Sequence, residues 1–149
     1  MNVEIRVKPK FSSRVVRTRL TCIARETLRA EKVNVALTIY VTDDAEIRKM
    51  NRAFHDTDAP TDVLAFPLQM EERLMWGRLI KRSYLGDIII SYDHARVQAH
   101  AVGWRIADEL DLLAVHGILH LLGYDDATPR KRAHMWKRQE EILGREIKE

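Results

Sequence analysis

Alternating apolar and polar positions predict the strands of this chain. Residues 2–7 alternate, and so do residues 33–41. A period of two places one face of such a segment against a core, which is typical of a half-buried strand. Two short apolar runs, 62–66 and 84–90, predict two more strands, and Pro67 closes the first of these runs.

Helical periodicity and capping residues predict five helices between and after these strands. Side chains that can cap a helix stand at four of the five expected starts: Ser12 or Ser13, Asp43 with Glu46 three residues later, Ser91, and Thr128 followed by Pro129. The expected helices cover about 12–31, 44–54, 92–102, 107–122 and 129–145, and a charged connection covers 68–83.

The chain is expected to form one domain, residues 1–149. It shows no internal repeat and no linker rich in Pro, Gly or Ser, and 149 residues is an ordinary length for one domain. No apolar run reaches the length of a membrane span, and the alternating N-terminus does not resemble a signal peptide. The single cysteine, Cys22, cannot form an intramolecular disulfide. These features predict a cytoplasmic protein with no membrane partner.

The most apolar predicted helix, 107–122, carries a candidate metal site. His116 and His120 lie four residues apart, so both imidazoles share one helix face. Gly123 ends the helix, and a left-handed glycine there can turn Asp126 back toward the two rings. Three protein ligands with a fourth position left for water are the arrangement of a catalytic zinc site. The pattern predicts one Zn²⁺ ion, or another divalent metal, on a helix whose buried imidazoles need a partner.

Other interpretations of this pattern stay open. Two histidines at this spacing also occur as structural side chains with no metal. Zinc peptidases place a Glu, their general base, directly after the first histidine. Gly117 occupies that position here, which disfavours ordinary peptidase chemistry.

Three segments carry a family resemblance. Residues 116–125 read His-Gly-Ile-Leu-His-Leu-Leu-Gly-Tyr-Asp, residues 60–67 read Pro-Thr-Asp-Val-Leu-Ala-Phe-Pro, and residues 85–91 read Leu-Gly-Asp-Ile-Ile-Ile-Ser. Together they resemble the YbeY family of bacterial metal-dependent endoribonucleases, which mature ribosomal RNA; that family has Ser at the Ala65 position. The resemblance spans nearly the whole chain. It implies an α+β fold: a small mixed sheet of about four strands, helices packed around it, and a central metal-binding helix.

The chain departs from the family pattern at two functional positions. The family has a third His after Gly-Tyr-Asp, whereas this chain has Asp126. A carboxylate can bind zinc, so the expected ligands are His116, His120 and Asp126, with Asp125 as the rival third ligand. The family also has an Arg, after an aromatic residue, that is implied to contact the scissile phosphate. His55 stands there and is the candidate catalytic residue in its place.

The positive charge is concentrated at the start of the chain. The net charge is only +3, but residues 1–32 carry nine Lys or Arg and three Asp or Glu. Four arginines of the first predicted helix share a face opposite Val16 and Leu20: Arg14, Arg17, Arg25 and Arg29. Such a face either follows an RNA backbone or is simply solvated.

The favoured function is a metal-dependent endoribonuclease selective for single strands. It would act in maturation of the 3′ end of small-subunit ribosomal RNA and in ribosome quality control, with RNA and the small ribosomal subunit as partners and no DNA. Two alternatives remain: a zincin-like metallohydrolase or peptidase, and a non-catalytic ribosome-assembly factor. The general base is not identifiable from the sequence.

Overall fold

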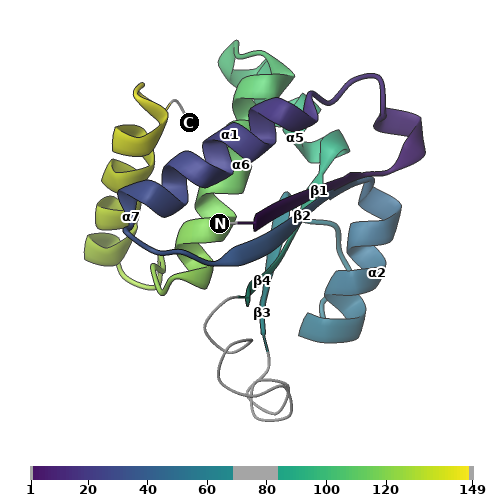
Figure 1. The fold of residues 1–149 in the computed structure, drawn as a ribbon. Coiled ribbons are helices and arrows are strands. Elements are labelled where there is room, and N and C mark those ends of the chain that lie inside the picture. The colour runs from purple at the N-terminus through teal and green to yellow at the C-terminus, as the bar shows by residue number, and fades with distance from the viewer. Residues whose placement is uncertain (1, 69–83, 148–149) are drawn as a thin grey trace.

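The computed structural model describes residues 2–68 and 84–147, and a four-stranded mixed sheet lies at its centre (Figure 1). The strands are β1 (Asn2–Val7), β2 (Ala36–Thr42), β3 (Val63–Pro67) and β4 (Tyr84–Ser91), in the order β1-β2-β4-β3. β1, β2 and β4 run parallel, and the edge strand β3 pairs antiparallel with β4. The expected α+β fold with four strands is confirmed. Of the predicted connection 68–83, residues 69–83 lie outside the described residues.

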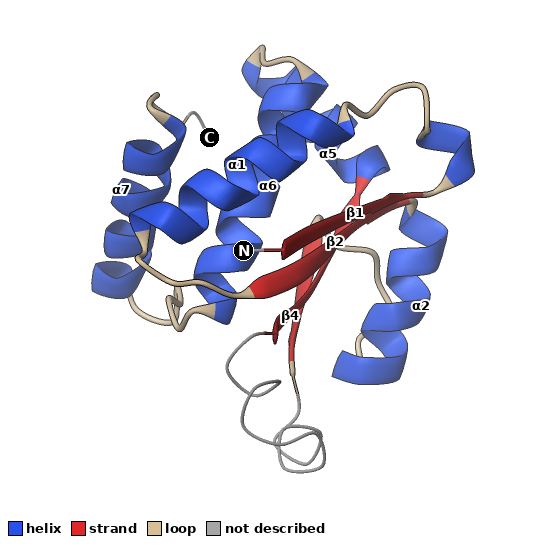
Figure 2. Ribbon diagram, in the orientation of Figure 1, coloured by secondary structure: helices blue, strands red, loops and turns tan. Residues whose placement is uncertain are grey.

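Helices cover both faces of the sheet, as Figure 2 shows. They are α1 (Arg17–Ala30), α2 (Asp44–His55), α5 (Tyr92–Val102), α6 (Ile106–Leu121) and α7 (Pro129–Leu143). Side chains of β4 alternate between the faces: Ile88 and Ile90 belong to the core beneath α1 and α6, and Ile89 packs with Ile47 of α2. The five expected helices are present, and none in the described part of the chain is long and apolar enough to cross a membrane.

The first helix begins later than its serines predict. The segment after β1 forms a 3-10 turn, Pro9–Phe11, and α1 starts at Arg17, so neither serine caps it. Phe11 is buried and stacks on Tyr92 with ring centroids 4.4 Å apart, which holds this segment against α5. Val16 occupies the N-cap position of α1, where no side chain caps the helix, and it is 60% exposed. The prediction that Val16 lies on the apolar face of this helix was therefore wrong.

Three of the expected caps are confirmed. The side chains of Asp43, Ser91 and Thr128 each accept a hydrogen bond from the backbone N–H three residues ahead. In a complete capping box, the Glu46 side chain would also accept from the backbone N–H of Asp43. Here the Glu46 carboxylate accepts instead from the hydroxyl groups of Tyr40 and Thr42. The cap and this second network both fix the start of α2.

α6 lies at the centre of the helical layer and contacts α1, α5, α7 and two strands. Most of its apolar side chains are buried, as its composition predicts. Arg19 of α1 donates to Asp108 and Asp111 of α6, each at 2.9 Å, and this clamp holds the two helices together. α6 is therefore a rigid support for whatever its remaining polar side chains do.

Candidate active site

The two histidines of α6 lie one turn apart with nearly parallel rings. Their centroids are 6.3 Å apart and the ring planes differ by 10°. His116 is half-buried, whereas His120 is exposed. The expectation that both imidazoles are buried is therefore wrong for His120, which lies at the end of α6 beyond the covered part of the helix.

His116 is held in one orientation by the last helix. Its Nδ1–H donates to Oε1 of Gln139 at 2.7 Å, and Gln139 on α7 is 3% exposed. A proton on Nδ1 leaves the lone pair on Nε2, the nitrogen that can bind a metal or accept a proton. Outer hydrogen bonds of this kind commonly orient histidines that bind metals. Gln139 therefore prepares His116 for either role.

The turn after α6 separates the two candidate carboxylates. Gly123 adopts a φ of +108°, and beyond it Asp126 lines the same cavity as His116. Asp125 accepts instead from the N–H of Ala127 at 3.0 Å and pairs with Lys131, and this environment, chiefly the N–H, lowers its pKa. Of the two, Asp126 is the carboxylate on the His116 cavity.

A closed set of three metal ligands is not formed. Within residues 2–68 and 84–147, no three His, Cys, Asp or Glu side chains lie close enough together to hold a metal ion. The donor chemistry nevertheless suits zinc, because two imidazoles share a face and a carboxylate lines the same cavity as one of them. The metal assignment stays a prediction.

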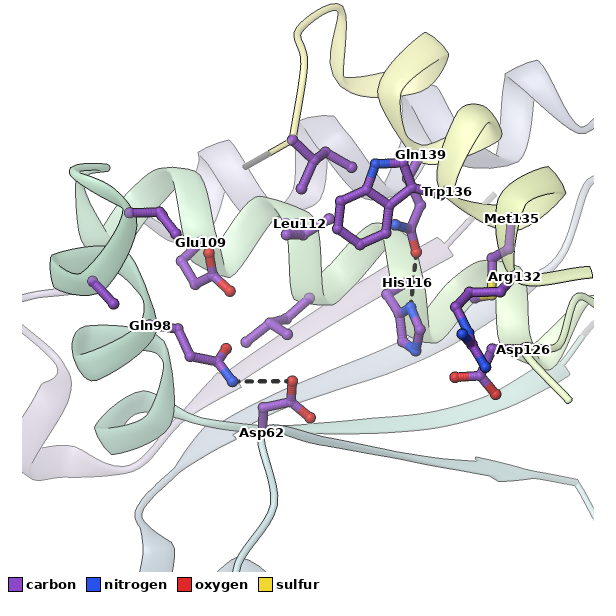
Figure 3. Close-up of a pocket in the computed structure, with 14 residues that line it drawn as sticks. Asp62, Gln98, Glu109, Leu112, His116, Asp126, Arg132, Met135, Trp136 and Gln139 are labelled. Atoms are coloured by element: carbon purple, nitrogen blue, oxygen red, sulfur yellow. Dashed lines mark hydrogen bonds between the residues drawn. The ribbon is translucent and has the colours of Figure 1, made fainter. Parts of the chain in front are cut away.

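The cavity has a volume of about 410 Å³ and lies between α5, α6 and α7 (Figure 3). Its walls are mostly apolar and include Leu112, Met135 and Trp136. Its polar groups gather toward two ends: His116, Asp126 and Arg132 toward one, and Asp62, Gln98 and Glu109 toward the other. A mostly apolar pocket with a few converging polar groups is the usual form of a ligand site.

Glu109 is the least expected member of this cavity. It is 6% exposed, and no hydrogen bond or ion pair joins its carboxylate to any residue that the structure describes. Burial, with the charge of Asp62, raises the pKa of Glu109 to about 7. Asp62 itself accepts from the N–H of Val63 at 2.8 Å and from Gln98 at 3.4 Å.

Neither this acid nor the residues around it were predicted from the sequence. A signal was present, because Glu109 precedes His116 by seven residues and so lies on the same face of an apolar helix. Arg132 was not among the predicted RNA-binding residues, although it lines the cavity. Trp136 is half-buried and also lines the cavity.

The four arginines predicted to bind RNA are exposed but do not line the cavity. Arg17, Arg25 and Arg29 lie on α1, whereas Arg14 lies in the turn before it, so the four do not share one helix. Within the described chain none of them forms an ion pair. Their charges are thus available to a partner.

His55 lies away from His116. It is the last residue of α2, which packs on the opposite face of the sheet from α6, and its ring lies 5.5 Å from that of Phe66. The neighbouring Phe54 is 71% exposed. The structure does not bring His55 to the cavity, and its role as a phosphate contact stays a prediction.

The chain is similar to known proteins along nearly its whole length. The model of the family described as Endoribonuclease YbeY matches residues 2–146. A protein of that name from Roseiflexus castenholzii is 39% identical, with 95% of this chain and 91% of the relative covered. One from Dehalococcoides mccartyi is 37% identical, with 100% and 95% covered. A solution structure of a protein from Thermotoga maritima superimposes with a TM-score of 0.63 at 26% identity, covering 95% of this chain and 86% of that chain.

Proposed function

Because the chain belongs to the endoribonuclease YbeY family, an assignment that makes it a hydrolase of RNA phosphodiester bonds, we propose that it cleaves single-stranded segments of ribosomal RNA. The process is maturation of the 3′ end of small-subunit RNA, with ribosome quality control as a related task. The small ribosomal subunit is the partner and the cytoplasm the place of action. The observation that carries this proposal is the match over residues 2–146 together with the His116 cavity.

The proposed cofactor is one zinc ion, held by His116, His120 and Asp126. The paired rings of α6 and the carboxylate on the same cavity as His116 support this ligand set. A bound zinc ion supplies a Lewis acid for phosphodiester hydrolysis. Gln139 orients His116 so that Nε2 is free to bind it.

The remaining groups act on the RNA. Arg132 places a positive charge on the wall of the cavity, where it can neutralise a phosphate. The exposed arginines of residues 14–29 supply affinity that does not depend on sequence, and His55, when protonated, contacts a phosphate further along the strand.

The peptidase alternative is disfavoured by the position of Gly117. This residue packs against β4, so the helix position that holds the general base of zinc peptidases faces the sheet in this chain. No comparable observation favours the assembly-factor alternative. A protein that only holds α7 against α6 would not need Glu109, a buried acid on the wall of a cavity.

Cleavage assays test the proposal. The purified chain is incubated with a single-stranded RNA, the same sequence as a duplex, and an unstructured peptide, each with a chelator and again after zinc is restored. We expect cleavage of the single strand alone, lost with the chelator and regained with zinc. His116→Ala should remove cleavage, and His100→Ala, an exposed histidine on α5, should not. Peptide cleavage, or RNA cleavage unaffected by His116→Ala, would contradict the proposal.

A further inference from the structure

Glu109 is more than nine-tenths buried, and its carboxylate, which points into the cavity, has no partner within the described protein (Figure 3). The charge of another carboxylate, Asp62, raises the pKa of Glu109 and so does not balance its charge. A buried charged group without a hydrogen bond is costly, so such groups are retained where a ligand satisfies them. The missing partner is therefore a group that donates hydrogen bonds.

We propose that this end of the cavity receives a nucleobase of the RNA substrate and selects guanine through Glu109. This inference rests on the proposed function and names the base that lies beside the scissile phosphate. Guanine offers two adjacent donors, N1–H and the N2 amino group, beside the O6 acceptor. Two carboxylate oxygens match the two donors in a bidentate pair.

The neighbouring polar groups complete the same pattern. One oxygen of Asp62 is already used by the N–H of Val63, and the other accepts from Gln98. The amide nitrogen of Gln98 has a second N–H, which can donate to O6 of a guanine. Adenine, cytosine and uracil do not present two adjacent donors next to an acceptor on this edge.

The apolar walls suit a base that has left its stack. Trp136 is half-buried and lines the cavity beside Leu112 and Met135. Recognition of single-stranded RNA commonly places an unstacked base on an aromatic side chain and reads its Watson–Crick edge. A volume of about 410 Å³ lies within the range of small-molecule pockets.

The spacing along α6 connects the base to the reaction. Glu109 and His116 are seven positions apart on α6, which corresponds to about 10 Å along the axis. A single nucleotide has about this length from its phosphate to the far edge of its base. A nucleotide whose phosphate lies near His116 and Arg132 can thus reach Glu109 with its base.

The first test measures binding without any cleavage. The full chain is titrated at pH 8, where Glu109 is ionised, with guanosine 5′-monophosphate and with inosine 5′-monophosphate, which lacks the N2 amino group. The readout is the NMR signal of the Trp136 indole N–H, assigned with Trp136→Phe. We expect the guanosine nucleotide to bind about tenfold more tightly, as a good bidentate contact provides. Glu109→Gln should remove this difference, and Glu26→Gln, an exposed acid on α1, should keep it.

The second test maps cleavage in a single-stranded RNA of random sequence. Guanine should be enriched at one fixed position beside the cut for the parent and not for Glu109→Gln. Equal binding of the two nucleotides, or a guanine preference that survives in Glu109→Gln, would overturn the proposal. Selective binding without RNA cleavage would uphold the guanine site and contradict the endonuclease assignment, so the two failures are distinct.

Discussion

Gly117 of α6 packs directly against Ile88 of β4. A Cβ atom built on Gly117 would lie 2.7 Å from Cγ2 of Ile88, closer than such carbon atoms approach one another. Ile88 is fully buried beneath α6, so its methyl group has no room to retreat. The glycine directly after the first histidine is therefore required by how closely α6 approaches the sheet.

Gly117→Ala should lower the free energy of unfolding. Overpacking of a tight core costs about 1–3 kcal/mol, and the higher helix propensity of Ala returns about 1 kcal/mol. We expect a net loss of up to about 2 kcal/mol by urea denaturation. Ile88→Ala removes the clashing methyl group, so in that background Gly117→Ala should cost much less. Additive effects of the two substitutions would show that the contact does not limit this position.

His120→Ala should abolish stoichiometric metal binding while the chain stays folded. His120 is exposed at the end of α6, so its loss removes a proposed ligand and leaves no cavity in the core. Elemental analysis and circular dichroism measure the two properties. His134→Ala, which removes an exposed histidine stacked on Tyr124, should keep the metal. A full equivalent of zinc in His120→Ala would exclude this ligand.

Glu109→Gln should stabilise the protein at alkaline pH. Burial raises the pKa of Glu109 to about 7 in the folded state, above its usual value of 4.5, so the folded protein holds this proton more tightly than the unfolded chain. The resulting stability is fully present below pH 4.5 and is lost as the pH rises through about 7. Gln stays neutral, so the variant should exceed the parent by about 1–3 kcal/mol at pH 8.5.

The same difference should be several-fold smaller at pH 5, where Glu109 is protonated in the folded protein, and should vanish only below pH 4.5. Urea denaturation at both pH values measures it. Glu26→Gln serves as the exposed control and should show no such dependence on pH. A constant difference between pH 5 and pH 8.5 would mean that Glu109 titrates normally.

Removal of the four exposed arginines should weaken RNA binding without a change in sequence preference. The variant carries Ala at Arg14, Arg17, Arg25 and Arg29. If each contacts a phosphate, the slope of log K against log salt concentration should fall by about 2–3 for a single strand. Lys49→Ala with Arg52→Ala on α2 should change the slope less than Arg25→Ala with Arg29→Ala. Equal slopes for the parent and the fourfold variant would make these arginines a solvated face.

Local hydrogen bonds explain which parts of the fold could be predicted. Asp43, Ser91 and Thr128 each cap a helix through a backbone N–H three residues away, so the pattern and the contact lie in one short segment. The start of α1 could not be predicted this way, because it depends on Phe11 stacking against Tyr92, a residue distant in the sequence.

The candidate site shows the same division. The His116 and His120 pair was visible because helical periodicity relates residues four apart. The cavity combines side chains of α5, α6, α7 and the loop before β3, and no local pattern relates Gln98 to Trp136. No sequence pattern therefore indicated that Arg132 faces the same space as Glu109.

The bond from His116 to Gln139 also bears on when the enzyme becomes competent during its own synthesis. Gln139 lies on α7, which is translated after every other helix and strand of the described chain. Until α7 leaves the exit tunnel, His116 lacks the partner that orients it and the cavity lacks the wall that contains Trp136. Domains fold as they emerge from their N-terminal side. A nascent chain from which α7 has not yet emerged thus carries an incomplete site.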